Sequence, residues 1–181
     1  MKKIAILASG AGTNAENIAR HFAGSDRARV TLVLTNVRDA GVVGRMAQLG
    51  IDTYYVPNAQ WRDQPGQIAD FLESQGIDLV VLAGFMVILT SEMVRAFPNA
   101  ILNVHPALIP SFAGPGCYGL HVHEKALAYG VKVSGATVHF VTQECDAGPI
   151  ILQKTVEVLP DDTPEVLQRR IMEECEWKLL P

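Results

Sequence analysis

Residues 100–111, AILNVHPALIPS, place an asparagine and a histidine two positions apart in an apolar run that ends at proline. Side chains of a strand alternate between faces, so Asn103 and His105 would share one face while Val104 takes the other. Pro106 cannot donate to a sheet ladder and favours an extended residue before it. We therefore expect an amide and an imidazole, groups suited to hydrogen bonding and acid–base chemistry, at the C-terminal end of a strand, where open parallel sheets bind ligands. A polar strand terminus with a hydrogen-bonded histidine is the alternative.

A glycine-containing segment, SGAGTN (9–14), separates an apolar run from an amphipathic one. Glycines there let backbone N–H groups approach an anion, and a helix N-terminus adds its positive dipole end. The dinucleotide fingerprint is incomplete, because a third glycine is missing and Thr35 and Asn36 stand where an acidic residue is required. The GK[ST] sequence of a P-loop is also missing. The segment predicts a phosphate site without a dinucleotide, with an empty strand–helix turn as the alternative.

Four further polar residues have plain structural interpretations. Asp146 lies in CDAGP, whose composition is typical of a turn. His121 and His123 are spaced as in some metal sites, but no carboxylate or cysteine cluster completes a ligand set, so structural roles are expected. His139 lies on a predicted strand beside Thr137 and is interpreted as a hydrogen-bonded core residue.

Glu176 has an unusual position in the last amphipathic segment. Met172, Glu176 and Leu179 are spaced i, i+4, i+7, which predicts a carboxylate along the apolar face of a helix. Such a group needs a partner, either a structural cation or a ligand amine.

The elements that must position these residues follow from apolar periodicity. The first half predicts strands at 3–8, 29–35, 52–57 and 78–84 and in the 100–111 segment, with helices after the first strand, over 40–49 and from about residue 63. This alternation predicts a doubly wound α/β sheet. Two later strands, 132–141 and 149–158, are separated by a loop too short for a crossover helix, so we expect an antiparallel pair. Thr163 and Pro164 predict the start of a final helix.

Composition narrows the class of protein. The chain has 181 residues, 49% of them hydrophobic, and a net charge of −4 without a basic stripe, which suits one domain that binds no nucleic acid. No stretch approaches the ~20 apolar residues of a membrane span, and the N-terminal IAILA is shorter than a signal-peptide core. Three cysteines without CxxC spacing favour neither disulfides nor zinc. We expect a cytoplasmic protein.

Taken together, the motifs resemble a known family. SGAGTN, LAGFMVIL (82–89), LNVHPALIPSF (102–112), GLHVHEKAL (119–127), GATVHFVTQECDAGPII (135–151) and EWKLLP (176–181) are similar to the phosphoribosylglycinamide (glycinamide ribonucleotide) formyltransferases, which are folate-dependent. The resemblance covers essentially the whole chain. It implies a Rossmann-like fold and transfer of the formyl group of 10-formyltetrahydrofolate to the amine of glycinamide ribonucleotide, in de novo purine biosynthesis. It also implies small-molecule substrates, no metal, and a monomer or homodimer.

The resemblance assigns Asn103, His105 and Asp146 to catalysis. Attack of an amine on the formyl carbon creates an oxyanion and an ammonium. An Asn103 N–H can stabilise the oxyanion, which is worth roughly 3–4 kcal/mol in other enzymes. His105 as imidazolium can assist and protonate the folate nitrogen that leaves, and a neighbouring Asp146 carboxylate would favour the charged ring.

The resemblance also implies binding residues. The ribonucleotide phosphate would bind Gly12, Thr13 and Asn14, and Glu176 would contact the glycinamide portion. The folate would contact Met86, Val87, Ile88 and Leu89 through backbone groups, as well as Asn103, with Arg62 near its tail. Residues 1–181 would form a single domain, with phosphate binding mainly in 1–100 and folate binding and catalysis mainly in 101–181.

The sequence departs from the family pattern at three places. Val87 stands where the family often has Arg or Lys, so a side-chain contribution to folate binding is expected to be lost. The loop 111–119 is longer than in the shortest relatives, and its glycines predict mobility. Relatives usually continue beyond Pro181, so a C-terminal segment is expected to be missing.

Other functions would share part of this sequence pattern. A 10-formyltetrahydrofolate hydrolase or another folate-dependent formyltransferase would share the Asn, His and Asp; the hydrolase would carry an additional N-terminal domain. A methionyl-tRNA formyltransferase would need a basic RNA-binding domain. A non-catalytic nucleotide-binding domain would not need Asn103, His105 and Asp146 together, and a nicotinamide dehydrogenase conflicts with Asn36 and the missing glycine.

Overall fold

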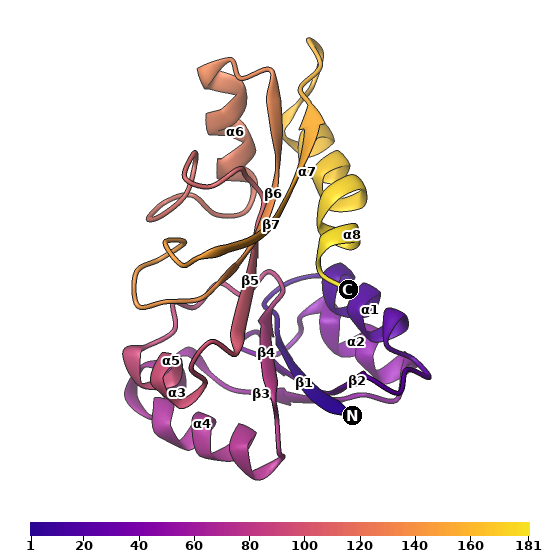
Figure 1. The fold of residues 1–181 in the computed structure, drawn as a ribbon, viewed down its shortest axis with the longest axis vertical. Helices are drawn as coiled ribbons and strands as arrows, with labels where there is room; N and C mark the ends of the chain where they lie inside the picture. Colours follow the sequence, from indigo (N-terminus) through magenta and orange to yellow (C-terminus); the bar gives the residue numbers. More distant parts are fainter. The chain divides into compact units, whose positions relative to one another are not determined.

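The computed structural model describes residues 1–181 and contains two compact units, Met1–Leu102 and Asn103–Pro181 (Figure 1). The strands are β1 (Lys2–Leu7), β2 (Ala28–Thr35), β3 (Asp52–Tyr55), β4 (Leu79–Leu82), β5 (Ile101–His105), β6 (Val133–Phe140) and β7 (Ile150–Glu157). Their order in the sheet is β3-β2-β1-β4-β5-β6-β7. The predicted α/β fold, a mostly parallel sheet with a C-terminal antiparallel pair, is confirmed.

The first unit is a parallel β-sheet covered by helices. β1 pairs in parallel with β2 and with β4, and β2 pairs in parallel with β3. Figure 1 shows α1 (Thr13–His21) and α2 (Gly41–Gln48) on one side of these strands and α4 (Pro65–Ser74) on the other. Residues 4–7 of β1 are almost completely buried because both faces of the strand are covered.

Two short helices in this unit were not predicted. They are α3 (Asn58–Asp63) and α5 (Ser91–Ala96), each of six residues. So few residues show little apolar periodicity, which is the main signal for a helix in sequence. Thr90 caps α5 by accepting a hydrogen bond from the Met93 N–H at 3.4 Å.

The second unit packs its helices against β5, β6 and β7. It contains α6 (Leu120–Tyr129), α7 (Pro164–Ile171), a π-helical turn (Met172–Glu176) and α8 (Trp177–Leu179). The antiparallel pairing of β6 with β7 is confirmed, as is the N-cap at Thr163, which accepts from the Val166 N–H at 3.3 Å. The buried core consists of Val104, Ala136, Val138, Val156, Leu167, Ile171 and Cys175.

The expected position of Glu176 on an apolar helix face is only partly correct. The π-helical turn changes the residue spacing at the end of the last helix. The buried positions are Leu167, Ile171 and Cys175, whereas Met172, Glu176 and Leu179 are intermediate in exposure. Glu176 therefore lies beside the apolar face instead of within it. No helix of the structure is both long enough and apolar enough to cross a membrane.

Candidate active site

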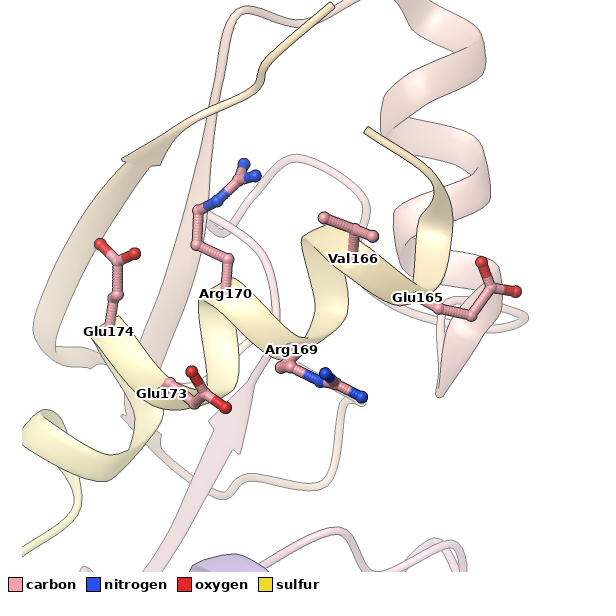
Figure 2. Close-up of a pocket in the computed structure, with 6 residues that line it drawn as sticks. All are labelled: Glu165, Val166, Arg169, Arg170, Glu173 and Glu174. Carbon is pink, nitrogen blue, oxygen red and sulfur yellow. The ribbon is translucent and has the colours of Figure 1, made fainter. Parts of the chain in front are cut away.

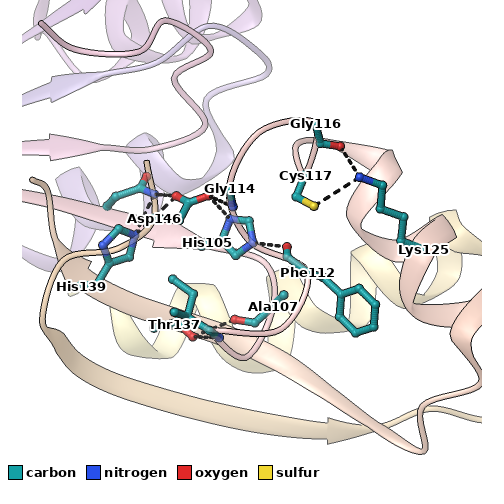
Figure 3. A network of polar contacts seen from close by, with 12 residues as sticks. His105, Ala107, Phe112, Gly114, Gly116, Cys117, Lys125, Thr137, His139 and Asp146 are labelled. Atoms are coloured by element: carbon teal, nitrogen blue, oxygen red, sulfur yellow. Dashed lines mark hydrogen bonds and ion pairs between the residues drawn. The ribbon is translucent and has the colours of Figure 1, made fainter. Parts of the chain in front are cut away.

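The carboxylate of Asp146 is the centre of a buried polar cluster in the second unit (Figure 3). Its side chain is 10% exposed and lies between the imidazoles of His105 and His139. Oδ2 accepts a hydrogen bond from the Gly114 N–H at 3.0 Å and lies 3.6 Å from His105 Nδ1. Oδ1 lies 3.4 Å from Asn103 Nδ2 and 3.7 Å from His139 Nε2. The three residues expected to perform the chemistry thus lie together.

His105 contacts an acceptor with each ring nitrogen. Nε2 donates to the Phe112 carbonyl oxygen at 2.7 Å, and Nδ1 faces the Asp146 carboxylate. Carbonyl and carboxylate oxygens accept only, so a doubly protonated ring satisfies both neighbours. Phe112 and Asp146 both have left-handed backbone conformations, with φ of 52° and 55°. Such conformations cost energy in residues other than glycine and are found preferentially at functional sites.

Asn103 donates to His139. The distance from Asn103 Nδ2 to His139 Nε2 is 3.1 Å, and His139 Nδ1 lies 2.9 Å from the carbonyl oxygen of Phe140. A carbonyl oxygen requires a proton on Nδ1, which leaves Nε2 as the acceptor of the neutral ring. Burial lowers the pKa of His139, although its hydrogen bond to Phe140 and the nearby Asp146 charge act in the opposite direction.

Strand geometry explains how Asn103 and His105 face the same cluster. Val104 between them belongs to the apolar core, as the alternation of β5 predicts. Downstream of His105, Thr137 on β6 fixes the chain by donating to the Ala107 carbonyl at 2.7 Å and accepting from the Ile109 N–H at 3.1 Å. These two bonds hold the segment between His105 and loop 111–119.

The loop that carries Asp146 approaches β6 closely. At Gly148, a Cβ atom would lie 1.7 Å from the Phe140 carbonyl oxygen, so no other residue fits there without moving the backbone. The Phe140 N–H donates to the Pro149 carbonyl at 3.0 Å, which closes this loop directly after His139. The CDAGP segment therefore reverses the chain and also positions the Asp146 carboxylate.

His123 on α6 is completely buried, and neither of its ring nitrogens has a hydrogen-bond partner. Burial lowers the pKa of His123 to about 4, and the positive charge of His105 contributes in the same direction. The expectation of a structural histidine is consistent with this environment. No group of three or more His, Cys, Asp or Glu residues is arranged to hold a metal ion.

The predicted phosphate segment forms the start of α1. Gly12 is the N-cap residue with a φ of 79°, and a Cβ there would lie 2.6 Å from Val42, so glycine is required for two reasons. The Ser9 hydroxyl accepts a hydrogen bond from the Met86 N–H at 2.8 Å. This bond joins the glycine segment to the segment 86–89 that was expected to contact folate.

The other expected binding residues differ in exposure. Met86 and Ile88 are exposed, Val87 is intermediate and Leu89 is buried. Arg62 lies on α3 with a side chain 74% exposed and forms an ion pair with Asp63 at 2.7 Å. Thr13, Asn14 and Glu176 each make polar or electrostatic contacts within the protein.

A shallow pocket on the outer surface of α7 is not a second active site. It is lined by Glu165, Val166, Arg169, Arg170, Glu173 and Glu174, whose side chains point in different directions (Figure 2). Arg170 is already paired with Asp162 at 2.5 Å. The pocket therefore has the character of a solvated helix face.

The sequence did not predict that His139 belongs to the polar cluster. It also did not predict that the backbone of Phe112 contacts His105 or that the backbone of Gly114 contacts Asp146. The strand pattern predicted a buried His139, but its contact with Asn103 depends on how β5 and β6 are aligned. Backbone contacts from a glycine-rich loop leave no side-chain signal.

Comparison with known proteins gives consistent matches. The family model described as "Formyl transferase" matches residues 2–181. The phosphoribosylglycinamide formyltransferase of Haemophilus influenzae is 39% identical over 186 residues, covering 100% of this chain and 84% of the relative. The crystal structure of glycinamide ribonucleotide transformylase 1 from Symbiobacterium toebii has a TM-score of 0.90 and 42% identity, covering 99% of this chain and 84% of that one.

Plant relatives are longer. The chloroplastic phosphoribosylglycinamide formyltransferase of Arabidopsis thaliana is 40% identical over 178 residues. Those residues are 96% of this chain and 61% of the relative. The corresponding share of the Vigna unguiculata protein is 57%. The chain therefore spans less than two thirds of the length of these two relatives.

The environment of His123 predicts how stability depends on pH. Its folded-state pKa of about 4 lies below the ordinary 6.5, so between these values the unfolded chain binds more protons. Stability should therefore fall as the pH is lowered through this range, with His123 contributing ~2 kcal/mol between about pH 7 and pH 5. A His123→Leu variant should lose this contribution, measured by urea unfolding at both pH values. His121→Leu, on the exposed side of the same helix, is the control, and an unchanged pH dependence in His123→Leu would contradict the prediction.

Proposed function

Because the chain belongs to the formyl transferase family, we propose that it transfers the formyl group of 10-formyltetrahydrofolate to the amine of glycinamide ribonucleotide, in de novo purine biosynthesis. The relatives named phosphoribosylglycinamide formyltransferase support this substrate. The observation that carries the proposal is the buried Asp146 carboxylate, with His105 and Asn103 against its two oxygens.

In the proposed reaction the neutral amine attacks the formyl carbon, and the carbonyl oxygen becomes an oxyanion. Asn103 Nδ2 carries two N–H groups, and its contact with Asp146 Oδ1 at 3.4 Å is long for a hydrogen bond. An oxyanion that forms beside Asp146 Oδ1 can accept this N–H in place of the carboxylate, while the 3.1 Å bond to His139 remains. A donor held in place before the reaction stabilises the developing charge without reorganisation.

His105 supplies the positive charge and the proton. Its Nε2 is occupied by the Phe112 carbonyl, so Nδ1 is the nitrogen that serves the reaction. The 3.6 Å between Nδ1 and Asp146 Oδ2 exceeds a hydrogen bond, so the Nδ1 proton can be shared with a water beside the pair. Through such a water, the proton of the attacking ammonium can pass to the folate nitrogen that leaves, so that the products are the formamide and tetrahydrofolate.

We propose the following binding residues for the two substrates. Gly12, Thr13 and Asn14 are proposed to bind the ribonucleotide phosphate through the N-terminus of α1, a nine-residue helix whose N-cap glycine has no side chain. Residues 86–89 are proposed to contact the folate through backbone groups, since Val87 provides no charged side chain. Arg62 is proposed to lie near the folate tail, and its 74% exposed side chain is compatible with that role.

We propose that the enzyme acts in the cytoplasm. All three cysteines are unpaired, which fits a reducing compartment such as the cytoplasm. Residues 1–100 would mainly bind the ribonucleotide phosphate, and residues 101–181 would mainly bind folate and carry out catalysis. The enzyme is proposed to be a monomer or a homodimer.

A formyl-transfer assay tests the function directly. With 10-formyl-5,8-dideazafolate as donor, absorbance should change only when glycinamide ribonucleotide is present. Loss of the formyl group without the ribonucleotide would instead indicate a hydrolase. A folded protein that does neither would contradict the proposal.

Substitutions in the cluster should reduce turnover while the protein stays folded. Asn103→Ala removes the oxyanion donor and should lower kcat roughly 100-fold or more. His105→Ala should cost at least as much, because the general acid is lost. Asp146→Ala should also lower kcat, by roughly 10-fold or more, because it releases His105. Circular dichroism checks the fold, and His121→Ala is the control. Any of the three that keeps a kcat near that of the unmodified protein does not have the proposed role.

Glu176 is proposed to bind the glycinamide portion of the ribonucleotide. A Glu176→Gln variant keeps the shape of the side chain and removes its charge, so KM for the ribonucleotide should rise roughly 10-fold, as for a lost charge-assisted hydrogen bond. KM for the folate should stay the same, which provides an internal control in the same steady-state experiment. An unchanged KM for the ribonucleotide would return Glu176 to a structural role.

A further inference from the structure

The proposed reaction leaves His139 without a role, although its side chain is only 2% exposed and lies within the same polar cluster. A buried histidine can be a passive part of the core. Here, however, both ring nitrogens have polar neighbours, and one of these is the catalytic amide of Asn103.

The Phe140 carbonyl determines which nitrogen of His139 carries the proton. Because that oxygen accepts only, Nδ1 must donate to it, and the neutral ring then presents an unprotonated Nε2. An unprotonated Nε2 is an acceptor, so it selects the nitrogen end of the Asn103 amide over the oxygen end. The same orientation brings Nδ2 to within 3.4 Å of Asp146 Oδ1, a second acceptor.

The geometry points to neutral His139 as a positioning residue for catalysis: by accepting one N–H of Asn103, it fixes the amide so that the other N–H points towards Asp146 Oδ1, beside which the formyl oxygen is proposed to react. This inference rests on the proposed formyl transfer, since the donor is useful only where an oxyanion develops. His139 itself does not contact the substrate in this role. It acts by preventing the amide of Asn103 from rotating by half a turn.

Protonation of His139 would reverse the preference. A proton on Nε2 would make it a donor, and Asn103 would then turn its carbonyl oxygen towards the ring and its N–H groups away. Two charged groups face His139, and they act in opposite directions: the Asp146 carboxylate favours protonation, whereas the His105 cation opposes it. Burial opposes it further, so the pKa of His139 is lowered and the active orientation persists into mildly acidic solution.

Two substitutions separate positioning from packing. His139→Leu removes the acceptor and should lower kcat ~10- to 100-fold, with both KM values within about twofold, because a misplaced donor affects the transition state most. His139→Gln can present a carbonyl oxygen near the position of Nε2 and cannot be protonated near neutral pH. It should recover most of the lost kcat. His121→Gln, an exposed histidine on α6, is the matched control and should behave like the unmodified protein.

The pH profile of kcat distinguishes this role from a structural one. In the unmodified protein, kcat should fall on the acid side as His139 is protonated, and this fall should be missing in His139→Gln. A folded His139→Leu with unchanged kcat would overturn the inference. So would a His139→Gln variant that is as slow as His139→Leu, or one that keeps the acid-side fall.

Nitrogen-15 NMR of the imidazoles provides a test that needs neither substrate nor a variant. At neutral pH, His139 should be the Nδ1–H tautomer, with the chemical shift of an unprotonated nitrogen at Nε2. A protonated Nε2 would overturn the inference even if the enzyme is active. If the tautomer is as expected but no formyl transfer is detected in the unmodified protein, the proposed function fails while the Asn103–His139 geometry stands. The two failures are therefore distinguishable.

Discussion

The buried carboxylate of Asp146 is the constraint on which the polar cluster of the second unit depends. A carboxylate that is 10% exposed is costly unless its oxygens are compensated by a positive charge and hydrogen-bond donors. His105, Asn103 and the backbone N–H of Gly114 provide that compensation, and they come from the end of β5 and from the loop that follows it. Compensating this one charge therefore brings the separate parts of the cluster together.

The cluster contains several ionisable groups but needs only one positive charge. His139 and His123 are both buried, and burial lowers the pKa of each, so these rings are neutral near pH 7. His105 differs because both its ring nitrogens face acceptors, one of them the carboxylate. A doubly protonated His105 beside Asp146 would place a positive charge where the proposed reaction develops its oxyanion.

Backbone geometry contributes as much as the side chains. Both groups that contact the ring of His105 belong to residues with a positive φ, Phe112 and Asp146. Gly148 permits a close approach that no side chain would allow, and it lies two residues after the carboxylate. The paired strands β6 and β7 flank the loop that carries Asp146, and a regular scaffold with a strained loop is common at enzyme sites.

Local patterns in the sequence determined the strands, the final antiparallel pair and the shared face of Asn103 and His105, because alternation and turn residues act over a few positions. They missed α3 and α5, which are too short to show a period, and the π-helical turn that displaces Glu176. Only the tertiary structure decided that His139 meets Asn103 and that His123 is buried without a partner. Contacts of this kind depend on how strands are aligned and helices packed, and residues 36 positions apart in sequence carry no local sign of it.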